Sequence, residues 1–186
     1  MRRLAIALVH HPVLDRQGAI VTSAVTNLDV HDLSRSARTF GAESFFVTSP
    51  IEAQRDLVSA IVGHWKDGSS GKRIPSRKEA LEGVRVVASV EEAVASFGGR
   101  ANVEIWITAA RADAGGVALD WDAARARLRS DDPRVVLVLF GTSWGLAPSL
   151  CAEADGRLPP ITGPTAYNHL SVRAACAITL DRLVAW

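Results

Sequence analysis

Short apolar runs alternate with helix-like stretches along most of the chain. Runs of four to eight mainly apolar residues are typical of buried strands. Five such runs occur, at residues 4–9, 44–48, 84–88, 103–108 and 135–140. Stretches with helical spacing of apolar positions lie between and after them, at residues 26–40, 52–65, 76–81, 90–97, 120–129 and 170–183. This alternation predicts an α/β fold, with a mainly parallel sheet and helices on both of its faces.

Single side chains mark where several of these helices begin and end. Thr26, Ser89 and Asp120 have short polar side chains, which accept hydrogen bonds from the backbone N–H groups of a first helical turn. Gly41 stands where a left-handed residue would end the first helix. Within that helix, the spacing predicts that Leu28 faces the core.

Length and composition indicate one domain without a membrane span. The 186 residues suffice for a sizeable core, and residues 1–186 are interpreted as a single domain. Apolar residues make up 48% of the chain, but no run of about 18 occurs. The first apolar run is cut short by His10 and Pro12, which favours a core strand over a signal peptide. Two cysteines, Cys151 and Cys176, fit core positions in a reducing cytoplasm, and no Cys/His spacing indicates a metal site.

Three turn-forming segments follow predicted strands, at residues 108–111, 140–146 and 158–168. The carboxyl ends of parallel strands meet at one edge of a sheet, where α/β proteins usually bind ligands. Glycines in these segments permit close approach of backbone to a ligand, and Pro159 and Pro160 stiffen the third. No GxGxxG pattern follows the first strand, so a Rossmann dinucleotide site is not indicated. The alternative is that all three are ordinary turns.

Two of these segments resemble motifs of the SPOUT superfamily (SpoU–TrmD class) of S-adenosylmethionine-dependent methyltransferases, most of which act on RNA. The stretches concerned are Leu139–Leu146 and Asn168–Val172, and the resemblance to one single-domain bacterial branch covers nearly the whole chain. It implies a carboxy-terminal trefoil knot, a homodimer and S-adenosyl-L-methionine as cofactor. The cofactor-binding residues that it implies are Thr108, Ala109, Ala110, Arg111, Phe140, Gly141, Thr142, Trp144, Gly145, Leu158, Pro159, Ile161, Gly163, Asn168, His169, Leu170 and Ser171.

Residues 26–35 resemble the first SPOUT motif, in which an Asn near a helix start precedes an Arg. On this resemblance Asn27 and Arg35 are catalytic candidates, and the spacing between them departs from the commonest form of the motif. A permanently charged guanidinium suits a phosphate or a polarised ribose hydroxyl. His10 is the third candidate, because imidazole titrates near neutral pH. The alternatives are an Arg35 paired with Asp32 and a structural His10.

The resemblance implies a defined reaction class. A methyl group would pass from the cofactor's sulfonium to RNA, either tRNA or rRNA, at a base nitrogen or a ribose 2′-OH. The alternative is a non-catalytic regulatory module that binds a cofactor or a nucleotide. A third interpretation is a generic flavodoxin-like binding protein.

Residues 66–75 are polar, glycine-rich and basic, and are predicted to be the most loop-like segment of the chain. Lys66, Lys72, Arg73, Arg77 and Lys78 lie in or beside it. They contact RNA phosphates in one interpretation, and form an ordinary solvated loop in the other. The net charge of only +1 means that any RNA-binding surface must be local.

Overall fold

The computed structural model describes residues 1–110 and 115–184. Its strands are β1 (Leu4–Val9), β2 (Val13–Leu14), β3 (Ile20–Val21), β4 (Ser44–Thr48), β5 (Val84–Val87), β6 (Val103–Ile107), β7 (Val135–Gly141) and β8 (Gly156–Arg157). Its helices are α1 (Asn27–Thr39), α2 (Glu52–Lys66), α3 (Ser69–Arg73), α4 (Pro75–Glu82), α5 (Val90–Ala95), α6 (Trp121–Arg129), α7 (Pro148–Ala152) and α8 (Val172–Val184), with a 3₁₀ turn at Arg100–Asn102.

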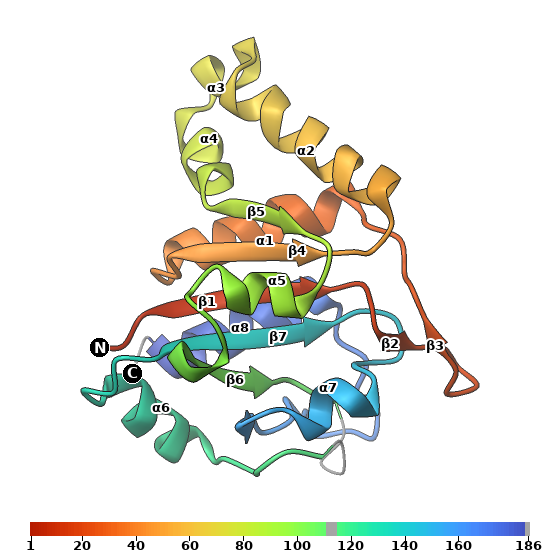
Figure 1. Cartoon of the computed structure of the whole chain (residues 1–186), viewed down its shortest axis with the longest axis vertical. Coiled ribbons are helices and arrows are strands. Elements are labelled where there is room, and N and C mark those ends of the chain that lie inside the picture. The colour runs from red at the N-terminus through yellow and green to blue at the C-terminus, as the bar shows by residue number, and fades with distance from the viewer. Residues whose placement is uncertain (111–114, 185–186) are drawn as a thin grey trace.

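A six-stranded sheet in the order β5-β4-β1-β7-β6-β8 forms the centre of the molecule (Figure 1). Every neighbouring pair in it is parallel, which confirms the predicted sheet. The central strands β1 and β7 are paired from Leu4↔Val136 to Val9↔Gly141. Their side chains are buried almost throughout, as expected for strands covered on both faces.

Helices cover both faces of the sheet, as the alternating pattern predicted. On one face Leu4, Ile6 and Leu8 of β1 join a core that includes residues of α1, α2, α4, α6 and α8. On the other face Ala5 and Ala7 join a core that includes residues of α5 and α7. The alternation along β1 follows from the two-residue period of a strand.

The predicted helix caps are confirmed. Thr26 accepts from the Asp29 N–H, Ser89 from the Glu92 N–H, and Asp120 from the Ala123 N–H. Gly41 has φ 73°, the left-handed conformation that ends a helix. Both cysteines are buried.

The predicted loop at residues 66–75 is wrong, because α3 and the start of α4 lie within it. Its glycines serve close packing. A Cβ at Gly71 would overlap the Trp65 carbonyl oxygen, and a Cβ at Gly68 would overlap the His64 carbonyl oxygen. Pro75 occupies the first turn of α4, where its missing N–H costs nothing. The low helix propensity of this segment therefore gave the wrong prediction, because packing against the end of α2 stabilises a helix there.

Two further expectations are corrected. Leu28 is 63% exposed and does not face the core. The final helix begins at Val172, two residues later than predicted. No helix among residues 1–110 and 115–184 is long and apolar enough to span a membrane.

Candidate functional site

Parts of two of the three predicted segments, 108–111 and 158–168, meet at the carboxyl end of β6, and residues 140–146 do not line the cavity there. Thr108, Ala109 and Ala110 lie there with Pro159 and Ile161, and with Asn168 and Leu170. Together with Ala175 and Thr179 of α8 they line a cavity of about 80 Å³. Residues 50 to 60 positions apart in the sequence are thus brought together as the strand-end pattern predicted.

Hydrogen bonds fix this arrangement. The Thr108 N–H and hydroxyl both donate to the Leu139 carbonyl, at 3.1 and 3.0 Å. The Leu158 N–H donates to the Ile107 carbonyl at 2.9 Å. The Asn168 side-chain amide donates to the Ala110 carbonyl at 2.9 Å. The last bond ties the carboxyl-terminal segment to the end of β6 and defines one wall of the cavity.

The turn after β7 is held beside the end of β1. The Leu14 N–H donates to the Gly145 carbonyl at 2.9 Å, and the Trp144 N–H donates to the Leu14 carbonyl at 3.0 Å. Gly145 has φ 106°, which a side chain would strain. Thr142 and Trp144 do not line the 80 Å³ cavity, and Trp144 is 59% exposed. This turn follows β7, the strand next to β6.

The remaining predicted cofactor residues lie around the same edge. Phe140 is buried in the core, Leu158 is buried at the end of β8, and Gly163, His169 and Ser171 are exposed. The exposed Tyr167 ring packs edge-to-face on His169, with 5.3 Å between centroids. Arg111 lies outside the described residues.

His10 belongs to a buried polar chain at the end of β1. Its Nδ1 lies 2.8 Å from the Ser23 hydroxyl, which lies 2.5 Å from the Thr142 hydroxyl. Because Thr142 donates to the Val9 carbonyl, Ser23 donates to Thr142 and accepts from His10. The proton of His10 is therefore on Nδ1, and the buried Nε2 is an acceptor with no partner among the described residues.

Electrostatics keep His10 neutral. Burial lowers its pKa to about 4, against the smaller opposing effect of the Asp29 carboxylate. The side chain is 0% exposed, so it does not reach the cavity surface. His10 joins β1 to the turn after β7 through Ser23 and Thr142.

An ion pair that the sequence did not reveal joins the starts of α1 and α8. The Arg173 guanidinium donates to the Asp29 carboxylate at 2.6 Å, and Asp29 also accepts from the Thr26 hydroxyl at 2.7 Å. Asp32 lies 3.6 Å from Arg173. The sequence signal was a cation at the start of a helix whose next seven residues carry no charge. This pair fixes the helix that carries Asn27 and Arg35 beside the helix that lines the cavity.

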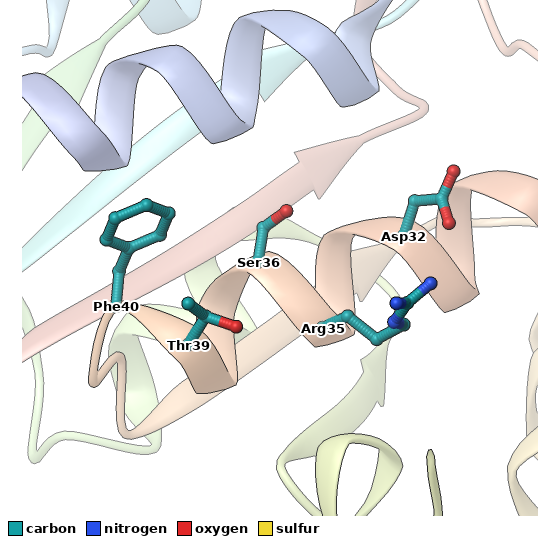
Figure 2. Close-up of a pocket in the computed structure, with 5 residues that line it drawn as sticks. All are labelled: Asp32, Arg35, Ser36, Thr39 and Phe40. Atoms are coloured by element: carbon teal, nitrogen blue, oxygen red, sulfur yellow. The ribbon is translucent and has the colours of Figure 1, made fainter. Parts of the chain in front are cut away.

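Arg35 and Asn27 are exposed on α1. Arg35 lines an open hollow of about 300 Å³ with Asp32, Ser36, Thr39 and Phe40, on successive turns of the helix (Figure 2). This hollow is separate from the 80 Å³ cavity. Within residues 1–110 and 115–184, no ion pair joins Arg35 to an acidic residue. Its guanidinium is therefore available to a ligand.

Other side chains offer little chemistry. Burial raises the pKa of Cys176 to about 12 and also raises that of Cys151, so both thiols are protonated at neutral pH. In the part of the chain that the structure describes, no three His, Cys, Asp or Glu side chains group as a metal site.

The parallel sheet and the cavity at its carboxyl edge define an α/β protein with a cavity where such proteins usually bind ligands. Residues 3–185 match the family model for SAM-dependent RNA methyltransferases, and the chain belongs to that family. The SPOUT resemblance found in the sequence is thereby confirmed.

Two proteins of similar sequence match nearly the whole of this chain, but they differ in their own length. A tRNA (guanine-N(1)-)-methyltransferase of Oleidesulfovibrio alaskensis is 41% identical over 183 residues, which are 98% of this chain and 42% of the relative. The chain thus spans less than half of that relative. An uncharacterised protein of Aquifex aeolicus is 34% identical over 96% of this chain and 86% of its own length. In Aquifex aeolicus the region that matches this chain therefore makes up most of the protein.

Solved structures share the fold at low identity. TrmJ from Zymomonas mobilis (Z. mobilis ZM4) has a TM-score of 0.62 at 16% identity, covering 99% of this chain and 68% of TrmJ. An AdoMet-bound rRNA methyltransferase from Sinorhizobium meliloti has a TM-score of 0.53 at 16% identity, covering 97% and 55%. At such identities the likeness is one of fold.

Proposed function

We propose that the chain transfers a methyl group from S-adenosylmethionine to RNA, with tRNA as the first substrate class to test. The observation that carries the proposal is the cavity formed where residues 108–110, 159–161 and 168–170 meet. Family membership supports the cofactor and the RNA substrate. The name of the Oleidesulfovibrio relative supports tRNA, although that relative has more than twice the matched length.

The residues present fit part of such a cofactor. Pro159, Ile161 and Leu170 offer apolar walls, and Thr108 and Asn168 offer polar groups at the rim. The cavity of about 80 Å³ is smaller than the roughly 300–1,000 Å³ of whole ligand sites. We infer that it takes one end of the molecule and that the turn at residues 141–146 meets the rest. When bound, the cofactor supplies an activated methyl group.

The remaining task of the protein is to place the RNA nucleophile and to remove its proton. Arg35 is proposed to hold or polarise the acceptor, because its charge is permanent, exposed and unpaired among the described residues. Asn27 is proposed to assist from the first turn of the same helix. His10 stays a catalytic candidate, although its burial favours a positioning role.

The Arg35→Ala variant tests this assignment. We expect methyl transfer from S-adenosylmethionine to bulk bacterial tRNA to fall about 100- to 1,000-fold, the range for losing one charge-stabilising group. Cofactor affinity measured by calorimetry should stay within about twofold, because Arg35 does not line the cofactor cavity.

Arg3→Ala is the control. Arg3 is also exposed and paired with a carboxylate, that of Glu43, and it lines neither the hollow nor the cavity. It should keep near wild-type activity. Equal activity in wild type and Arg35→Ala would contradict the role of Arg35. A protein that binds the cofactor but methylates no RNA would support a non-catalytic module.

We further propose a homodimer in the cytoplasm. Leu28 is 63% exposed and Leu170 is 47% exposed. Leu28 lies in the first turn of α1 and Leu170 lies two residues before α8, and the Asp29–Arg173 pair joins these two helix starts. An exposed apolar patch of this kind favours a second copy as its cover. The two buried cysteines fit a reducing compartment.

A carboxy-terminal trefoil knot is also proposed. Its support is the position of β8, which pairs with β6 on one side. On the other side Arg157 exchanges backbone hydrogen bonds with Val117 and Leu119, at 2.7 and 2.9 Å. The chain that leaves β6 for α6 thus passes outside β8. Residues after β8 return to α8, which packs against α1 and α6.

A further inference from the structure

Positive charge is concentrated in one short part of the chain. Residues 64–78 contain five Lys or Arg and one Asp, a net charge of +4, and residues 79–82, which complete α4, add Glu79 and Glu82. Because the whole chain carries +1, the residues outside 64–78 together carry −3. A local anion-binding surface is therefore compatible with a nearly neutral protein.

This part of the chain forms a fixed projection. The end of α2, with α3 and α4, lies beyond the β5 edge of the sheet (Figure 1). The close packing at Gly68 and Gly71 holds α3 against the end of α2. The Arg38–Glu79 ion pair joins α1 to α4. The cations are thus displayed on short helices with defined positions.

An aromatic cluster connects the projection to α1. The Arg77 guanidinium lies over the Trp65 ring, 5.0 Å from its centroid. His31 of α1 and His64 of α2 pack edge-to-face on the same ring, at 5.5 and 5.7 Å. Trp65 therefore holds α1, α2 and α4 together at one point.

The same cluster places Arg35 at the end of the basic surface. Burial lowers the pKa of His31, and the charges of Arg77 and Arg35 lower it further, against the opposing charge of Asp32. His31 and Arg35 are four residues apart on α1, so their side chains lie on the same face of the helix, and His31 packs on the Trp65 ring that Arg77 also covers. Positively charged side chains are therefore found from α3 and α4 to Arg35, the residue proposed to hold the RNA acceptor.

These cations lack acidic partners. Among the described residues, no ion pair involves Lys66, Lys72, Arg73, Arg77 or Lys78. By contrast, Arg3, Arg100 and Arg134 on other parts of the molecule each pair with a carboxylate. Adjacent unneutralised charges repel one another unless a polyanion lies against them.

We propose that the surface formed by Lys72, Arg73, Arg77 and Lys78 binds the phosphodiester backbone of the RNA substrate and leads it to Arg35. The proposal rests on the proposed function and adds to it the place where RNA is held. Contacts of this kind give affinity and orientation without base specificity. Trp65 positions Arg77 and is not assigned a contact with RNA.

The triple variant Lys72→Gln/Arg73→Gln/Lys78→Gln tests the surface. Binding of bulk bacterial tRNA is measured over a series of KCl concentrations. Each lost phosphate contact lowers the slope of log K against log salt by about 0.7 to 0.9. We therefore expect a slope smaller by about 2 to 3 in the variant, and binding about 10- to 100-fold weaker at low salt.

The control variant Arg3→Gln/Arg16→Gln/Arg129→Gln removes the same charge from exposed positions elsewhere. It should keep the wild-type slope. An unchanged slope in the test variant, an equal change in both variants, or no tRNA binding by wild type would overturn the proposal. S-adenosylmethionine affinity, measured on all three proteins, separates the outcomes. If it is intact, the RNA surface alone has failed; if wild type lacks it, the proposed function has failed.

Discussion

Replacing Glu104 with Gln is expected to lower the free energy of unfolding by about 3–5 kcal/mol, as when one partner of a buried ion pair is removed. Glu104 is 3% exposed. Its carboxylate accepts from the Arg2 guanidinium at 2.6 Å and from the Trp106 indole N–H at 2.9 Å. Gln keeps the shape of the side chain and removes its charge, which leaves the buried Arg2 only the more distant Asp132 carboxylate, at 3.8 Å.

Thermal unfolding measures this effect. For chains of this size each kcal/mol corresponds to about 2–4 °C, so the midpoint should fall on the order of 6–20 °C. Glu43→Gln is the control, because the Arg3–Glu43 pair is exposed. Exposed pairs contribute about 0–1 kcal/mol. A Glu104→Gln variant as stable as the Glu43→Gln variant would contradict a structural role for the buried pair.

The stability that Glu104 contributes is expected to depend on pH. Burial alone would raise the pKa of Glu104, but hydrogen bonds from Trp106 and Arg2 and the charges of Arg2 and Arg134 outweigh it and lower the pKa below its ordinary value. Stability from this group is thus present above the unfolded pKa and lost as pH falls toward the folded pKa. The difference in stability between wild type and Glu104→Gln should shrink as the solution is acidified from neutrality. A difference that stays constant would contradict the lowered pKa.

Gly141→Ala is expected to weaken S-adenosylmethionine binding at least about tenfold, or 1.4 kcal/mol. A Cβ at this position would lie 2.8 Å from the Leu146 nitrogen and 3.0 Å from its Cγ. The nitrogen belongs to the backbone, so the turn at residues 141–146 must shift to make room. That turn is the part of the proposed site which meets the cofactor outside the small cavity.

Gly83→Ala is the matched control for Gly141→Ala. No heavy atom lies within 4 Å of a Cβ built at Gly83, and its φ of −79° suits any residue. The affinity of both variants and of wild type for S-adenosylmethionine is measured by calorimetry and compared. Wild-type affinity in Gly141→Ala would remove the turn at residues 141–146 from the cofactor site.

The sequence predicted features that depend on local chemistry. Thr26, Ser89 and Asp120 cap helices because each side chain bonds to a backbone group three residues away. Apolar runs predicted the parallel strands, because strands covered on both faces consist mostly of apolar residues. The meeting of Thr108 with Asn168 followed from the rule that parallel strands share a carboxyl edge.

Other features depend on partners far apart in the chain. Asp29 and Arg173 are 144 residues apart, and neither signals the other in the sequence. Strand β8 has two residues, too few for any periodicity. The glycines of residues 66–75 indicated a loop. In the structure Gly71 packs against the Trp65 carbonyl oxygen, where a Cβ would not fit. His10 was recognised as a titratable residue, but its burial and its Ser23–Thr142 partners were not visible in the pattern.

The central claim is that the carboxyl edge of the sheet binds S-adenosylmethionine. Calorimetric titration of the purified wild-type chain with S-adenosylmethionine tests it most directly, with NAD and FMN as controls. We expect saturable binding with a dissociation constant on the order of micromolar, about −8 kcal/mol, and no binding of NAD or FMN. A folded protein that binds none of the three, or binds all three alike, would contradict the claim and leave these segments as structural turns.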